Sequence, residues 1–309
     1  MHAASNEVES AALRTLLRSF GQIVLQRNAV TGACLLAAWL ACDPRLACAA
    51  LIGAVSANIG AVLAGYDEAG TRDGLHGFNG ALAGLAAFTF IGDDATAAAI
   101  AILAGMATAW GLGPWSRWLS ARGLSVYSSP CLIVTWLWLP LITPRVALTV
   151  TPYRLASFAH LSDGVLSGLA QMGFASGAVP GLLVLAGIAA SSLRHAGWAL
   201  AGAGIAGASH LLLGVGLSSF DAGLLGFNGA LTALALAECG WVAALGGILL
   251  SVVLQQIAGR YGLPVMTAPF VAATWTVQRL RRRRPTGPSG ATGKPAALPR
   301  SPRALTRTG

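Results

Sequence analysis

The hydrophobic residues of this chain lie in long uncharged runs rather than in alternating or amphipathic patterns. Four such runs are Leu46–Tyr66, Ala95–Ser116, Gly123–Pro144 and Gly164–Leu193. Each is long enough to cross the hydrocarbon core of a bilayer, which takes about 20 helical residues at 1.5 Å per residue. The core helices of a soluble protein normally keep a polar stripe, which these runs lack. The pattern therefore predicts an all-α integral membrane protein with multiple spans.

The runs divide into a series of helices that occurs twice. The second half repeats the first from about Leu161 to Val277, and two helices in each half are too short for a full crossing. Short apolar segments at matching places in two halves of a transporter indicate a central binding site. We expect about five transmembrane helices in each half, with short re-entrant segments that span half the membrane. The helices predicted for the first half are Leu13–Gln26, Val30–Cys42, Leu46–Gly65, Phe78–Ile91, Ala95–Gly111 and Pro130–Leu141.

A glycine-rich phrase is written twice along the chain. "GLHGFNGAL" at Gly74–Leu82 and "GLLGFNGAL" at Gly223–Leu231 differ at one position of nine. Their offset is 149 residues (227 minus 78, taking the phenylalanines). The same offset lays "GQIVLQRNAVTG" over "AQMGFASGAVPG" further upstream, which aligns Gln22 with Gln171.

A third match lies downstream. "SSPCLIVTW", which begins at Ser128, aligns with "TAPFVAATW", which begins at Thr267, at an offset of 139 residues (267 minus 128). The first half therefore holds ten extra residues, which we place in Gly113–Gly123. Three matches in the same order indicate a duplicated unit.

The duplication predicts the topology of the chain. If each half crosses the membrane an odd number of times, the two repeats are inverted about an axis in the membrane plane, and both termini lie on one side. We expect an N-terminal cytoplasmic segment at 1–12, a first repeat at 13–145, a second repeat at 146–280 and a basic tail at 281–309.

The charges qualify this topology. Only 10% of the residues are charged, against about a quarter in soluble domains, and the net charge is +9. The segment from Arg279 onward contains nine basic and no acidic residues, and the rest of the chain contains 11 of each sign. The tail is typical of a cytoplasmic stop after the last span, in contact with the lipid bilayer, rather than of a nucleic-acid partner. Both termini are then cytoplasmic, and Pro285–Gly309 is expected to be disordered.

The candidate chemistry excludes several classes of function. The five cysteines show no metal or redox spacing, and no histidine or intramembrane carboxylate recurs at equivalent places in both halves. Nucleotide-binding loops and nucleophile–base arrangements are absent as well. We expect no cofactor, no metal and no enzymatic activity.

The repeated motifs, together with "GQIVLQ", "SPCLIVTW" and "APFVAATW", resemble the urea transporter family from about Arg14 to Arg279. The resemblance implies a homotrimer in which every protomer carries urea passively through its own central pore. It also implies two slots, with the walls of one formed by Leu25, Phe78 and Leu82 and the walls of the other by Phe174, Phe227 and Leu231. Thr135 and Thr274 would lie at the narrow centre between the slots.

The residue types suit such a pore. Urea is flat, neutral and rich in hydrogen-bonding groups, so a pore for it needs apolar walls against its faces and acceptors along its edge. Phe78 and Leu82 are four residues apart and face one direction on a helix, although ordinary helix packing produces the same spacing. Leu25 stands where the family commonly has an aromatic residue, which leaves open the relative widths of the slots.

The polar members of the motifs have alternative roles. Gln22 and Gln171 either orient urea or tie neighbouring backbone together, because a buried amide must be satisfied. Asn79 and Asn228 follow the slot phenylalanines at glycine-flanked helix breaks, and we expect them to brace the breaks rather than to touch substrate. A helical threonine usually bonds its own backbone carbonyl. We nevertheless favour the pore role for Thr135 and Thr274, because the family resemblance implies that they lie at the narrow centre, where the two half-pores meet.

The leading hypothesis is a facilitative urea channel of the cytoplasmic membrane. The alternatives are a channel for another small neutral amide or for ammonia, and a membrane-embedded enzyme or structural subunit. An ammonia channel would need histidines that face each other at mid-pore. An intramembrane enzyme would need a cluster of titratable groups within the spans.

Overall fold

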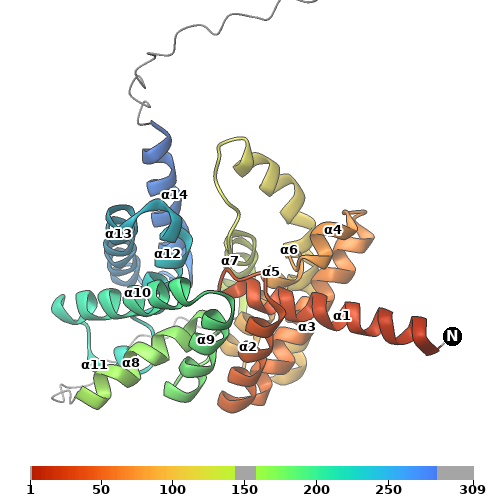
Figure 1. The fold of residues 1–309 in the computed structure, drawn as a ribbon, viewed down its shortest axis with the longest axis horizontal. Helices are drawn as coiled ribbons and strands as arrows, with labels where there is room; N and C mark the ends of the chain where they lie inside the picture. The colour runs from red at the N-terminus through yellow and green to blue at the C-terminus, as the bar shows by residue number, and fades with distance from the viewer. Residues whose placement is uncertain (1, 143–157, 284–309) are drawn as a thin grey trace, which may run out of the picture.

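The computed structural model describes residues 2–142 and 158–283, and all the regular secondary structure of these segments is helical (Figure 1). The first half comprises α1 (His2–Ile23), α2 (Ala29–Cys42), α3 (Pro44–Leu63), α4 (Glu68–Arg72), α5 (Gly77–Phe90), α6 (Asp94–Ser120) and α7 (Ser129–Ile142). The second half comprises α8 (Phe158–Ala170), η1 (Gln171–Gly173), α9 (Ala178–Ser191), α10 (Leu193–Leu212), α11 (Leu217–Asp221), α12 (Phe227–Leu236), η2 (Ala237–Cys239), α13 (Trp241–Arg260) and α14 (Ala268–Arg283).

Three of the described helices, α3, α6 and α13, are long and apolar enough to cross a membrane. The segment formed by α8, η1 and α9 is long and apolar enough only as a bent pair of helices, with an angle of 67° at the break. Two of the uncharged runs are therefore not straight spans. The run from Gly164 is interrupted at Phe174 and Gly177, which both have positive φ. In the run from Gly123, the helix α7 is only 14 residues long.

The predicted helices of the first half are present, with two shifted boundaries. The first begins at His2 rather than Leu13. The fifth continues past Gly111 to Ser120 although it contains Pro114. A proline lacks the N–H that would bond the carbonyl four residues earlier, here that of Trp110. The Tyr66 hydroxyl donates to that carbonyl oxygen at 3.0 Å, so the helix passes the proline without leaving it unpaired.

The remaining boundary differences are smaller. The short helices α4 and α11 were not predicted, and α14 extends past Val277 to Arg283. The predicted disorder of Pro285–Gly309 and the predicted boundary between 145 and 146 lie outside the described residues.

Glycine lets the helices around α5 and α12 approach closely. A Cβ on Gly53 of α3 would overlap the Gly80 carbonyl oxygen of α5, and a Cβ on Gly80 would overlap that of Gly53. Gly202 of α10 and Gly229 of α12 meet in the same way. Small residues allow such backbone contact between membrane helices. Each short central helix is therefore pressed against a longer neighbour.

Unusual backbone conformations recur at the repeat offsets. The non-glycine residues with positive φ in the described segments are Leu25 (60°), Phe174 (62°), Tyr127 (48°) and Met266 (43°). Leu25 and Phe174 are 149 residues apart (174 minus 25), and Tyr127 and Met266 are 139 apart (266 minus 127). Such residues are uncommon and costly, so their pairing shows that the two halves use the same turns.

Candidate functional site

The six apolar residues of the predicted slots belong to one hydrophobic cluster. Phe78 and Leu82 on α5, and Phe227 and Leu231 on α12, are all buried in it. Leu25 and Phe174 pack against the cluster and are partly buried. Two residues four apart on each short helix therefore reach the same central region from both halves, as their spacing predicts.

Leu25 and Phe174 sit at tight turns where α1 and η1 end. The Leu25 amide donates to the Gln22 carbonyl at 3.0 Å, and the Phe174 amide donates to the Gln171 carbonyl at 3.2 Å. The left-handed conformation of a bulky residue is strained and persists only where the surroundings impose it. These turns hold the two side chains in fixed positions against the central cluster.

The two glutamines make equivalent contacts with the backbone. The Gln22 Nε2 donates to the Asp73 carbonyl at 2.7 Å, and the Gln171 Nε2 donates to the Ala222 carbonyl at 3.4 Å. Asp73 and Ala222 each come directly before a copy of the repeated phrase. The amide nitrogens thus tie the end of α1 and η1 to the turns that lead into α5 and α12.

Asn79 bridges two segments in the first half. Its Oδ1 accepts from the Cys131 amide and its Nδ2 donates to the Tyr127 carbonyl, both at 3.2 Å. Cys131 lies in the first turn of α7, where a backbone N–H has no partner within the helix. The side chain therefore pairs two backbone groups that the fold of α7 leaves unsatisfied.

Asn228 repeats this arrangement in the second half. Its Oδ1 accepts from the Phe270 amide at 3.2 Å, in the first turn of α14, and its Nδ2 donates to the Met266 carbonyl at 3.1 Å. The Nδ2 also donates to the Gln255 Oε1 at 2.9 Å, and within the described residues Asn79 shows no counterpart of this contact. Both asparagines are 1% exposed. Neither amide faces open solvent. Asn79 joins the start of α5 to the start of α7, and Asn228 joins the start of α12 to the start of α14.

The two threonines are fully buried at equivalent positions of α7 and α14. The Thr135 Oγ1 lies 3.8 Å from the Cys131 sulfur, and the Thr274 Oγ1 has no hydrogen-bond partner in the part of the chain that the structure describes. The nearby Thr276 instead donates to the Ala272 carbonyl of its own helix at 2.8 Å, which is the usual bond of a helical threonine. A buried hydroxyl without a partner is unusual, and Thr274 therefore offers a free polar group inside an apolar region.

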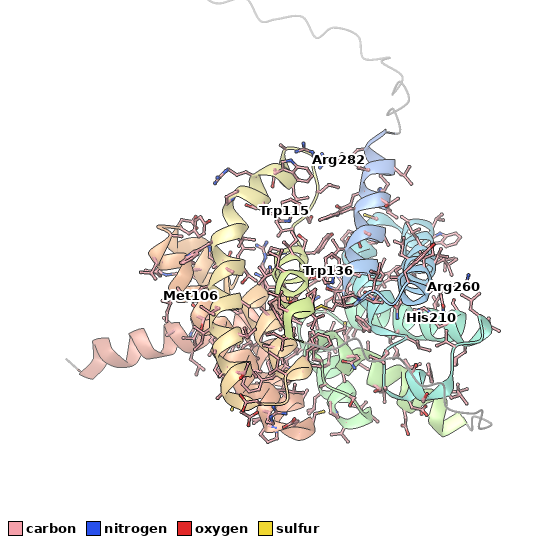
Figure 2. All side chains as sticks on the ribbon, turned by 180° about the vertical axis from the view of Figure 1, so that it is seen from behind. Met106, Trp115, Trp136, His210, Arg260 and Arg282 are labelled. Carbon is pink, nitrogen blue, oxygen red and sulfur yellow. The ribbon has the colours of Figure 1, made fainter. Side chains whose placement is uncertain are left out.

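The third pair of motifs bonds reciprocally across the two halves. The Trp136 Nε1 donates to the Pro264 carbonyl at 2.9 Å, and the Trp275 Nε1 donates to the Ser125 carbonyl at 2.7 Å. Between them, the hydroxyls of Ser128 and Thr267 are 2.7 Å apart. Figure 2 shows Trp136 between the two halves. These contacts were not predicted from the sequence, although 136 and 275, 125 and 264, and 128 and 267 are each 139 residues apart.

The surroundings of the two helix breaks differ in polarity. A Cβ on Gly77 would overlap the Ser19 hydroxyl and lie 3.1 Å from the Asn58 Oδ1, and the preceding His76 is buried with its ring stacked on Tyr66. In the second half a Cβ on the equivalent Gly226 would lie 3.2 Å from the Gly168 Cα and 3.4 Å from the Ala203 Cβ, and the Phe220 ring packs nearby between Gly164 and Gly207. The first break therefore has polar neighbours and the second apolar ones. Among the described residues, no group of three or more His, Cys, Asp or Glu side chains is placed to hold a metal ion.

Comparison with protein families places residues 13–282 in the family described as "Urea transporter". Comparison with curated proteins gives no match to the chain.

Proposed function

Since the matched region, residues 13–282, covers most of the chain, this protein belongs to the urea transporter family, and we propose that it passes urea through a passive, slot-shaped pore. Membership makes it an all-α, multi-pass membrane transporter rather than an enzyme. The main observation in support of the pore is the pair of short helices α5 and α12. Both carry Phe-Asn-Gly in their first turn, lie in one central cluster and are held by equivalent asparagine contacts.

We also propose that the two halves are inverted repeats. Arg282, near the end of α14, packs against Gly123, which follows the end of α6, and Arg281 bonds the Cys239 carbonyl, just before the start of α13. The end of α6 and the start of α13 are therefore at the same side of the molecule. Because α6 and α13 follow equivalent short helices in the two halves, their opposite directions support inversion about an axis in the membrane plane.

The slot walls in this proposal are Phe78 and Leu82 with Leu25, and Phe227 and Leu231 with Phe174. The Thr135 and Thr274 hydroxyls lie where the two half-pores join. Gln22 and Gln171 use their nitrogens on the backbone, which leaves the Oε1 atoms as candidate acceptors for urea NH2 groups. Apolar walls with a few placed polar groups can strip water from a flat amide without leaving its donors unpaired.

The family assignment and the basic tail support a proposal for the assembly and the location of the protein. We propose a homotrimer with one pore per protomer in the cytoplasmic membrane, with both termini in the cytoplasm. The direct test is urea efflux from liposomes that contain the purified protein, followed by stopped-flow light scattering. Protein-free liposomes are the control. Equal efflux rates in the two preparations would exclude urea transport, and parallel runs with acetamide and ammonia test the alternative substrates.

Replacing Phe78 or Phe227 with alanine is expected to lower selectivity for urea over larger amides such as N,N′-dimethylurea. Each change removes one wall of a slot and widens it, whereas a phenylalanine that only packs would affect stability alone. Phe20→Ala is the matched control, because Phe20 is fully buried against Trp39 and is not a slot residue. Its loss should cost about 3–5 kcal/mol of stability without changing the flux ratio.

The flux ratio is measured for each variant in proteoliposomes with equal amounts of folded protein. Selectivity equal to the wild type in both Phe78→Ala and Phe227→Ala would remove these residues from the slot.

Transport is expected to be electrically silent and nearly independent of pH between about 6 and 8. Urea carries no charge, whereas each charge moved would feel about 2.3 kcal/mol per 100 mV. None of the proposed pore residues titrates near neutrality, since unperturbed carboxyls and amines titrate near about 4 and 10. Urea flux is measured in proteoliposomes with and without an imposed potential and across this pH range. A urea-dependent current, or accumulation driven by protons or sodium, contradicts a passive pore.

A further inference from the structure

The end of α6 is longer than the equivalent part of the second half. This helix has 27 residues and its counterpart α13 has 20, so most of the extra residues of the first half extend α6. The extension carries Trp115 and Trp118, with Arg122 just beyond it. In Figure 1 the end of α6 and the end of α14 lie at the same end of the molecule.

Positive charge gathers where these two helix ends meet. We call this region the arginine rim, and its members, all exposed, are Arg117, Arg122, Arg279, Arg281 and Arg282. Residues 95–142 and 240–283 contain no Asp or Glu. The nearest acidic residue in sequence to the Cys239 carbonyl is Glu238, which already pairs with Arg194 at 2.8 Å. The rim therefore carries positive charge that the described protein does not neutralise.

Two of these arginines are held in place by the protein. The Arg122 guanidinium lies 3.7 Å above the Trp118 ring and donates to the Trp118 carbonyl at 3.0 Å. Trp118 stacks on Trp115 at 5.0 Å, and the Trp115 Nε1 donates to the Ser129 hydroxyl at 2.8 Å. A guanidinium stacked on an anchored aromatic pair loses little further entropy when it binds a ligand.

Arg282, on α14 in the other half of the molecule, packs its guanidinium against Gly123. A Cβ on Gly123 would overlap its guanidinium, so this packing depends on the glycine, which also has a φ of 67°. Gly123 follows directly after Arg122, so one short turn brings together a cation from each half. Figure 2 shows Arg282 and Trp115 at the same end of the molecule.

We propose that Arg122 and Arg282 together bind the phosphate of an anionic phospholipid headgroup between the ends of α6 and α14. Arginine forms paired hydrogen bonds with phosphate oxygens, and tryptophans mark the depth at which headgroups lie. An acidic lipid surface attracts such a cluster. Because the two arginines come from different halves, a bound lipid links the α6 extension to α14. This role is separate from urea permeation and does not depend on it.

The test compares full-length protein in nanodiscs of phosphatidylcholine alone with nanodiscs that also contain phosphatidylglycerol. Wild-type protein is expected to unfold at a higher temperature in the presence of phosphatidylglycerol, since a ligand bound only to the folded state stabilises it. The double variant Arg122→Gln/Arg282→Gln is expected to lose most of that increase. It is also expected to retain less phosphatidylglycerol in native mass spectrometry.

Arg260→Gln is the control for loss of an arginine away from the proposed site. Arg260 is an exposed arginine at the opposite end of α13 from the rim, about 30 Å away along a 20-residue helix. It should keep the full effect of phosphatidylglycerol. Equal responses of the double variant and the wild type would overturn the proposal, as would an equal loss in Arg260→Gln.

A second variant covers the case in which the glutamines prevent folding. Arg122→Lys/Arg282→Lys keeps both charges but not the paired geometry, and it should retain less phosphatidylglycerol than the wild type. Retention equal to the wild type would show that diffuse charge alone attracts the lipid, and this outcome also overturns the proposed site.

Discussion

Asn79→Ala and Asn228→Ala are expected to destabilise the protein strongly, Asn228→Ala more so, and both variants should lose most of their urea flux. Alanine at 79 leaves the Cys131 amide and the Tyr127 carbonyl without their side-chain partner. Each buried polar group left unsatisfied costs about 1–3 kcal/mol. Asn228 additionally binds Gln255, whose Nε2 holds the Leu224 carbonyl at 2.8 Å, so its loss disturbs a third contact.

Flux should fall because each asparagine positions a slot phenylalanine. Phe78 and Phe227 directly precede the asparagines, and the lost bonds connect the starts of α5 and α12 to α7 and α14. A short helix released from these contacts no longer holds its phenylalanine against the central cluster. The measurements are the unfolding temperature in detergent and urea flux per folded protein in proteoliposomes.

Asn28→Ala is the control for this pair. Asn28 caps α2 by accepting from the Val30 amide at 2.8 Å, and loss of such a cap typically costs about 1 kcal/mol. This variant should be slightly less stable and should transport urea normally. If Asn79→Ala and Asn228→Ala match Asn28→Ala in both measurements, the asparagines do not organise the site.

Thr274→Val is expected to slow urea flux while leaving the unfolding temperature unchanged or higher. The Thr274 hydroxyl is buried without a partner among residues 2–142 and 158–283, so the folded protein gains nothing from it and bears the cost of its desolvation. Its value then lies in binding the permeating molecule. Loss of one contact of about 0.5–1.5 kcal/mol at the narrowest point slows passage roughly two- to twelvefold.

Thr135→Val should slow flux by a similar factor, because Thr135 is the equivalent residue of α7 and its hydroxyl has only a long contact with the Cys131 sulfur. The control is Thr276→Val on the same helix as Thr274. Its hydroxyl is exposed and bonds the helix backbone, so flux should stay at the wild-type value. Wild-type flux in both Thr135→Val and Thr274→Val, or an equal loss in Thr276→Val, would contradict the central role of these hydroxyls.

The uncharged runs and the repeated phrase were sufficient to predict an all-α membrane protein with short central helices near Phe78 and Phe227. Both signals are local, because the length of an apolar run and a glycine next to an asparagine can be read without knowing what lies nearby. The offsets of 149 and 139 residues also aligned Gln22 with Gln171 and Asn79 with Asn228. The structure gives each pair equivalent partners.

The tertiary structure decided the features that depend on groups far apart in the chain. Helix α6 passes Pro114 because the Tyr66 hydroxyl pairs with the carbonyl that the proline cannot bond, and no local pattern around Gly111 reveals that partner. The two roles left open for Gln22 could be compared only once the Asp73 carbonyl was seen at its amide. The packing of the Arg282 guanidinium against Gly123 likewise joins residues from different halves. Sequence patterns determine which segments are apolar and where the backbone can break, but the partner of a buried polar group is set by packing.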